Sequence, residues 1–118
     1  MVYDAIHAHG SLDVGLPPGP NFFSYGEPGF AAQLLARAGF VNISTMEVPL
    51  VWRVSSPDAI IDAISSGTVR AAAVLRLQRP ENLARIKEYL RERVSAYERN
   101  GIYAVPSPAL VARGSKPG

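Results

Sequence analysis

Two histidines close together near the amino terminus are the first candidates for chemistry. His7 and His9 lie in the sequence VYDAIHAHG, with Asp4 and Asp13 nearby. Residues i and i+2 of a helix point in different directions, so this pair is not expected to hold a metal ion together. Either histidine can act as a base or a hydrogen-bond donor toward a substrate. A histidine that is only packed or solvated is the alternative.

Four aromatic residues are further candidates, here for the wall of a small-molecule pocket: Phe22, Phe23, Tyr25 and Trp52. The two phenylalanines stand in the loop sequence PNFFSYG, where large apolar side chains need a place to be buried. Packing in the core is the competing explanation for them and for Trp52. No residue is predicted to be catalytic, to bind a cofactor or to ligate a metal.

The sequence lacks the residues and motifs that disulfides, thiolate metal sites and common hydrolase sites require. The chain has no cysteine, which excludes disulfides and thiolate metal sites. Neither an H-E-x-x-H nor a G-x-S-x-G sequence is present, and Gly114-Ser115 stands in the predicted tail instead of a nucleophile turn. A hydrolase or a metal enzyme is therefore not favoured.

Composition and charge favour one folded domain, or part of one, in 118 residues of which 47% are hydrophobic. A net charge of +2, with basic residues interleaved with glutamates, does not favour nucleic-acid binding. No apolar run reaches the roughly 18 residues of a membrane span. The sequence after Met1 does not have the pattern of a signal peptide, so a cytoplasmic protein is expected.

A helix, a glycine stop and a long strand are predicted between Glu27 and Val54. The sequence EPGFAAQLLARAG has the apolar spacing of one buried helical face, with Pro28 in the first turn and Gly39 as the left-handed cap. The following sequence, VNISTMEVPLVWRV, alternates with the period of a strand. Pro49 interrupts it, which predicts a sheet edge or a bulge.

The rest of the chain is predicted as four segments. Residues 1–26 form a helix end stopped by Gly10 and a loop rich in proline and glycine. Residues 55–100 form a helical cap, with helices starting at Ser56, Thr68 and Pro80 and the last one ending at Asn100-Gly101. Residues 101–113 form a final strand in which Pro106 and Pro108 require one edge to be free or covered by a loop, and residues 114–118 form a frayed tail. The expected fold is α+β, a single partial domain in which an antiparallel pair of about 41–54 and 102–113 is covered by about four helices.

In this order of elements the chain resembles the C-terminal portion of a class I S-adenosylmethionine-dependent methyltransferase. It is closest to the small-molecule enzymes of the ubiquinone/menaquinone-biosynthesis type. The resemblance covers nearly the whole chain and rests on VYDAIHAHG, FFSYGEPGFAAQLLARAGFVNI, EVPLVW, SSPDAIIDAI, GTVRAAAVLRLQ and VPSPALVARG. It implies the C-terminal half of a Rossmann-like α/β fold. The two strands would be its sixth and its antiparallel seventh, and the helices of Ser56–Asn100 would form an inserted cap beside the substrate site.

One departure from the family is large. Its cofactor site lies in the first half of the domain, on a turn with a G-x-G core after the first strand. No two glycines of this chain are separated by a single residue, and no strand precedes Tyr3. The resemblance therefore implies S-adenosylmethionine as the cofactor of a parent enzyme, but no cofactor for this chain alone, which is expected to be inactive.

In that interpretation the chain contributes the pocket for a small-molecule acceptor, with the two histidines and four aromatic residues as its candidate lining. Its partner would be the missing N-terminal half or a second copy. The alternative is a non-catalytic α+β module that binds a small apolar ligand or a protein partner, as a homodimer that satisfies its free sheet edge.

Overall fold

The computed structural model describes residues 1–21 and 23–118, so the pocket candidate Phe22 lies outside the described residues. The described chain is an α+β protein with two small antiparallel sheets, as the sequence predicts for its fold class. It divides into two compact units. Unit 1 comprises Met1–Pro17 and Trp52–Val105, and unit 2 comprises Pro18–Val51 and Pro106–Gly118.

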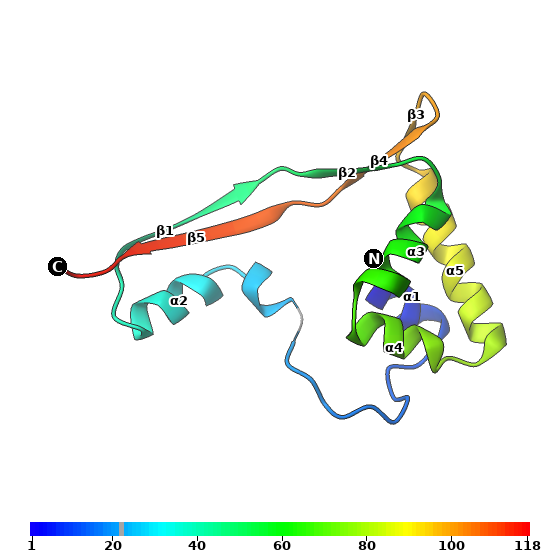
Figure 1. Cartoon of the computed structure of the whole chain (residues 1–118), viewed down its shortest axis with the longest axis horizontal. Helices are drawn as coiled ribbons and strands as arrows, with labels where there is room; N and C mark the ends of the chain where they lie inside the picture. The colour runs from blue at the N-terminus through cyan, green and yellow to red at the C-terminus, as the bar shows by residue number, and fades with distance from the viewer. Residues whose placement is uncertain (22) are drawn as a thin grey trace. The chain divides into compact units, whose positions relative to one another are not determined.

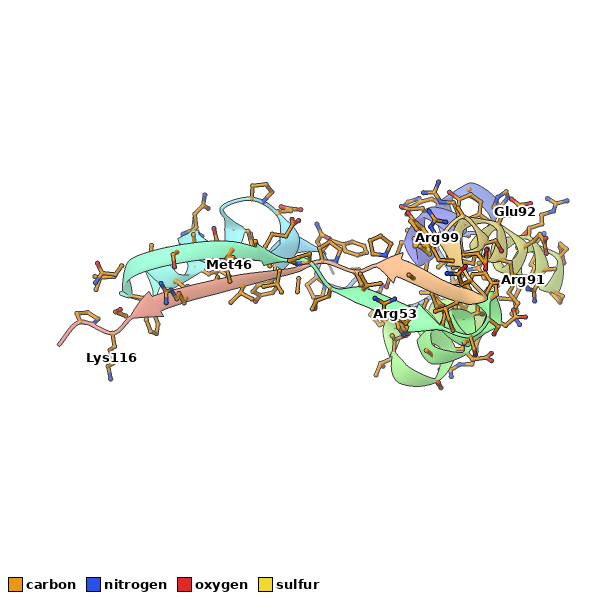
Figure 2. All side chains as sticks on the ribbon, turned by 90° about the horizontal axis from the view of Figure 1, so that it is seen from above. Met46, Arg53, Arg91, Glu92, Arg99 and Lys116 are labelled. Atoms are coloured by element: carbon orange, nitrogen blue, oxygen red, sulfur yellow. The ribbon has the colours of Figure 1, made fainter. Side chains whose placement is uncertain are left out.

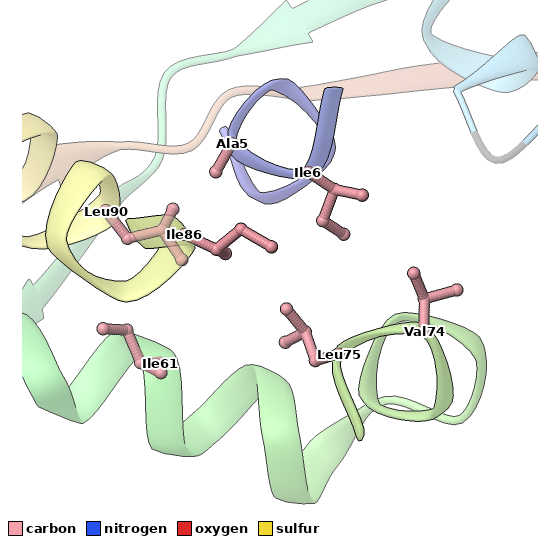
Figure 3. Close-up of a cluster of buried hydrophobic side chains, with 7 residues drawn as sticks. All are labelled: Ala5, Ile6, Ile61, Val74, Leu75, Ile86 and Leu90. Carbon is pink, nitrogen blue, oxygen red and sulfur yellow. The ribbon is translucent and has the colours of Figure 1, made fainter. Parts of the chain in front are cut away.

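Unit 1 is built on four helices that share one core. They are α1 (Val2–His9), α3 (Pro57–Gly67), α4 (Arg70–Arg76) and α5 (Pro80–Ser95) (Figure 1). Each helix contributes to a cluster of buried side chains made of Ala5, Ile6, Ile61, Val74, Leu75, Ile86 and Leu90 (Figure 3). Burial of a large aliphatic side chain stabilises a fold by about 1.5–3 kcal/mol. This packing explains how an eight-residue helix such as α1, too short to persist alone, is formed.

Helix α3 begins where the sequence predicts, directly after Ser56. The Ser56 hydroxyl accepts a hydrogen bond from the Ala59 N–H at 3.3 Å, and Pro57 occupies the first helical position. Thr68 lies at the boundary between α3 and α4. Its hydroxyl accepts a hydrogen bond from the Ala72 N–H at 3.2 Å. Helix α4 itself begins at Arg70, two residues later than the predicted cap.

The end of α5 corrects the prediction of a helix that reaches Asn100-Gly101. The helix ends at Ser95, and β3 (Glu98–Arg99) and β4 (Ile102–Pro106) follow as an antiparallel hairpin. Asn100 and Gly101 form its two-residue turn, with φ values of 54° and 79°. Positive φ at both positions is what such a turn requires, and Asn-Gly supplies it. The strand β2 (Val51–Val54) completes this sheet in the order β2-β4-β3.

Unit 2 contains one α-helix, α2 (Phe30–Arg37), the short 3-10 helix η1 (Ser24–Gly26) and two strands (Figure 1). The helix ends as predicted: Gly39 has φ 86°, its N–H donates to Ala36 O, and the Phe40 N–H donates to Leu35 O, both at 3.0 Å. These two bonds satisfy carbonyls that the helix end leaves open. Its start was predicted wrongly, because Gly29, at φ 79°, precedes the helix and leaves Pro28 outside the first turn.

The strands β1 (Val41–Val48) and β5 (Ala109–Ser115) pair antiparallel, as predicted, in a register that runs from Val48↔Ala109 to Val41↔Ser115. Four details of the prediction were wrong. The strand 41–54 is broken between Val48 and Val51, and the final strand is broken between Pro106 and Ala109. Ser115 belongs to β5 instead of a frayed tail. The four helices of unit 1 do not belong to the unit that contains this pair, where the helix is α2.

Unit 2 differs from unit 1 in having no buried side chain among its described residues. Met46 and Val111, which are cross-strand partners on the same face, are 63% and 46% exposed. Figure 2 shows Met46 projecting from β1. A two-stranded ribbon with a single helix is marginal by itself. Unit 2 therefore lacks the buried apolar contacts that stabilise unit 1.

Candidate functional site

A cluster of polar and aromatic side chains lies where the end of α1 meets α5. His9 is the last residue of α1, and its ring lies 5.3 Å from the Tyr89 ring, between centroids, at an interplanar angle of 60°. The guanidinium of Arg93 lies over the same tyrosine ring, 5.6 Å from its centroid. Tyr89 thus has both an imidazole and a cation near its ring.

These residues border a groove of about 360 Å³ lined by His9, Arg85, Glu88, Tyr89 and Glu92. On α5, Tyr89 lies four positions after Arg85 and three before Glu92, and Glu88 lies three after Arg85 and four before Glu92, which places the four residues on one side of the helix. The groove therefore combines aromatic walls with one guanidinium and two carboxylates. A small, flat, polar molecule fits this chemistry, and His9 can donate or accept a proton toward it.

Ion pairs hold the neighbouring part of α5. The Arg91 guanidinium contacts Asp58 at 2.8 Å and Glu88 at 3.3 Å. The hydrogen bond from Arg91 to Asp58, followed by that carboxylate's charge, raises the pKa of Arg91 above its usual value. Figure 2 shows Arg91 and Glu92 on this helix. Glu88 is thereby drawn toward Arg91, whereas Glu92 has no ion pair within the described residues.

The chain is tightly packed just after His9. A Cβ on Gly10 would lie 2.8 Å from the Ile86 Cδ1 atom and would also overlap the side-chain oxygen of Gln78. Only glycine fits here without displacing those side chains. The segment that leaves α1 directly after His9 is therefore packed against Gln78, which lies between α4 and α5, and against Ile86 of α5.

The other predicted pocket residues are not gathered at the groove. His7 is exposed on α1 and does not line it. Trp52, on β2 of unit 1, is 40% exposed and is not among the lining residues. Phe23 and Tyr25 belong to unit 2, where Tyr25 is 67% exposed and its ring meets Phe30 edge-on at 5.3 Å.

The sequence analysis missed the residues that α5 contributes to the groove. Their charges had been considered only as basic residues interleaved with glutamates. The available signal was the position of Tyr89, an aromatic residue on that polar face between Arg85 and Glu92. A second hollow of about 390 Å³ lies in unit 2 beside Ala38, Gly39, Phe40, Lys116 and Pro117, with a single charged side chain.

No group of three or more His, Cys, Asp or Glu side chains within residues 1–21 and 23–118 is placed to hold a metal ion. Across the same residues, none of the helices has the length and apolar character needed to cross a membrane. Comparison of the chain with protein-family models, with curated proteins and with solved structures finds no match.

Proposed function

We propose that this chain is the acceptor-side part of an S-adenosylmethionine-dependent small-molecule methyltransferase, lacking the cofactor-binding half and inactive alone. The observation that carries the proposal is the arrangement of unit 2. Helix α2 leads through a glycine-ended cap into β1, and β1 pairs antiparallel with β5, although the helices of unit 1 separate the two strands in sequence. That order is the one the resemblance implies for the last two strands of a Rossmann-like sheet with an inserted cap.

The exposure of unit 2 supports the same proposal. A sheet that continued into further strands and helices would cover the Met46 and Val111 side chains and provide the missing core. An enzyme of this class needs such a continuation, because the strands that carry the cofactor belong to the same sheet. The proposal thus accounts for a unit that has defined secondary structure but no buried residue among those described.

The described residues do not fit the cofactor itself. They include no glycine-rich turn between a strand and a helix, which is the element that brings backbone N–H groups close to such a ligand. S-adenosylmethionine would therefore be held by the missing half, and no residue of this chain is assigned to it.

Within the proposal, the groove at His9 is the acceptor-side candidate. Methyl transfer depends mainly on holding the acceptor in line with the donor and on removing one proton from it. His9 can take that proton from an acceptor hydroxyl, and Tyr89 can hold the acceptor's flat face.

The coding DNA upstream of Met1 tests the parentage directly. The proposal predicts an in-frame segment that encodes a strand, a turn with a G-x-G core and a helix, followed by a second strand that ends in an acidic residue. An in-frame stop codon next to Met1, or a reading frame without that turn, contradicts the proposal.

One observation favours a second candidate, a non-catalytic module that binds an apolar ligand or a protein. The open face of β1 and β5 presents Met46 and Val111 without cover from the described residues of unit 2. Titration with S-adenosylmethionine does not separate the two candidates for this short chain, whereas the upstream sequence does.

A further inference from the structure

The groove beside His9 has side chains of opposite charge at the two ends of its α5 wall. Arg85 is the first residue of α5 that lines the groove, and Glu92 is the last. The seven positions between them correspond to nearly two helical turns, a rise of about 10 Å. The positive and the negative side chain are therefore attached at opposite ends of one wall.

Neither of these two charges is paired within the described part of the chain. The ion pairs there join Met1 to Asp4 and Arg91 to Asp58 and Glu88, and none includes Arg85 or Glu92. The third charged residue of the groove, Glu88, is held by Arg91 at 3.3 Å. The groove thus leaves one guanidinium and one carboxylate open to a ligand.

The wall between the two open charges is aromatic. Tyr89 lies four positions after Arg85 and three before Glu92, and its side chain is half-buried. The His9 ring lies against the Tyr89 ring, with 5.3 Å between centroids. Arg93 lies over the tyrosine ring but is not among the residues that line the groove. A flat ring in contact with Tyr89 would therefore have an open charge on either side.

We propose that the groove binds a flat aromatic zwitterion, with its anionic group at Arg85 and its cationic group at Glu92. A guanidinium binds a carboxylate through two parallel hydrogen bonds, and the Glu92 carboxylate pairs with an ammonium group. A ligand with two anionic groups would bring one of them to Glu92, and a ligand with two cationic groups would bring one to Arg85. A neutral ring would leave both charges of the groove unpaired.

Only the identification of this ligand as the methyl acceptor rests on the proposed function. In that function the zwitterion names the substrate class, an aromatic ring with an acidic and a basic substituent on opposite sides. His9 then borders the ring, because it contacts the tyrosine that lies between the two charges. Binding itself needs no cofactor, and all five lining residues belong to unit 1.

Three probes that share one ring test the charge preference. They are 4-(aminomethyl)benzoate, which carries both charges, 4-methylbenzoate, which carries only the anion, and 4-methylbenzylamine, which carries only the cation. Each is titrated at neutral pH into the 15N-labelled chain, and amide shifts of α5 are followed by NMR. The zwitterion should bind about three-fold more tightly than either singly charged probe, the effect of one exposed ion pair. Equal or tighter binding of a singly charged probe, or no binding of any, overturns the proposal.

Charge-removing variants locate the two ends. Glu92→Gln should weaken binding of the zwitterion about three-fold and leave 4-methylbenzoate unaffected, and Arg85→Gln should weaken the zwitterion and leave 4-methylbenzylamine unaffected. Glu81→Gln and Arg79→Gln are the matched controls, because both residues are exposed at the start of α5 and neither lines the groove. Both controls should bind the zwitterion as the wild type does.

An equal loss in the controls, or no loss in Glu92→Gln or Arg85→Gln, overturns the placement of the ligand. These titrations contain no S-adenosylmethionine, so their failure leaves the proposed parentage to the upstream DNA. Conversely, an upstream frame without a G-x-G turn refutes the proposed function and leaves the binding preference of the groove unchanged.

Discussion

The side-chain amide of Gln78 binds both backbone groups of Ser11. Its Nε2 donates to Ser11 O at 2.6 Å, and its Oε1 accepts the Ser11 N–H at 3.0 Å. Gln78 is the buried polar residue of unit 1, and its Nε2 also donates to Val74 O at 3.1 Å. One side chain therefore fixes the segment that leaves α1 directly after His9 and Gly10.

Replacing this residue should destabilise unit 1. Gln78→Leu removes the hydrogen bonds that this side chain makes to Ser11 and to Val74, and a typical intramolecular hydrogen bond contributes about 0.5–1.5 kcal/mol. Urea unfolding followed by circular dichroism measures the loss. Gln33→Leu, on the exposed face of α2, is the matched control and should change stability by less than about 0.5 kcal/mol. Equal losses in the two variants would contradict this role of Gln78.

A methyl group added to β5 should disturb the packing of unit 2. The Cβ of Gly114→Ala would lie 2.9 Å from the Phe40 Cβ atom and 3.4 Å from the Ile43 Cγ1 atom. Overpacking of this kind destabilises a fold by about 1–3 kcal/mol. Gly26→Ala is the control, because its Cβ would meet no atom within 4 Å. Retention of wild-type stability in Gly114→Ala would show that β5 does not approach Phe40 this closely.

The two histidines should differ in their effect on stability. His9→Ala removes the ring contact with Tyr89 and should cost about 0.5–1.5 kcal/mol, the range measured for aromatic pairs. His7→Ala, at an exposed position of the same helix, should stay within about 0.5 kcal/mol of the wild type. The free energy of unfolding of the two single variants makes the comparison. A larger loss for His7→Ala contradicts the placement of the groove.

Stability should depend on pH through Asp4. A hydrogen bond from the Met1 amino group at 2.6 Å, and then the charge of that group, lower the pKa of Asp4 below its usual value. A lowered folded-state pKa contributes stability that is present above the unfolded pKa and lost as pH falls through the folded pKa. Because the carboxylate is 62% exposed, the contribution at neutral pH is below about 1 kcal/mol.

The variant Asp4→Asn removes the contribution of the Asp4 carboxylate to the free energy of unfolding. Its stability difference from the wild type should be largest near neutral pH and should shrink as the solution is acidified below the unfolded pKa. Chemical unfolding at several pH values measures the difference. A difference that grows on acidification has the wrong sign and contradicts the assignment.

Local signals in the sequence predicted element ends where a single residue type decides the backbone. Gly39 and Ser56 illustrate this, since a left-handed cap and a hydroxyl cap are local interactions. The same reasoning failed at Asn100-Gly101, because both a helix end and a hairpin turn favour that pair. The strands that follow decide between the two, and their pairing is not a local property.

The groove was less predictable than the fold. His9 was a candidate from its residue type, but its contact with Tyr89 depends on how α1 packs against α5. Because His9 and Tyr89 are far apart in the sequence, no rule of residue spacing predicts their contact.

Calorimetric titration with S-adenosylmethionine tests the central claim most directly, when it is run on this chain and on the longer polypeptide encoded by its in-frame upstream DNA. The chain of 118 residues should give no saturable heat, because its sequence contains no G-x-G for a cofactor-binding turn. The longer polypeptide should bind one equivalent. Saturable binding by the short chain, or none by the longer one, contradicts the account.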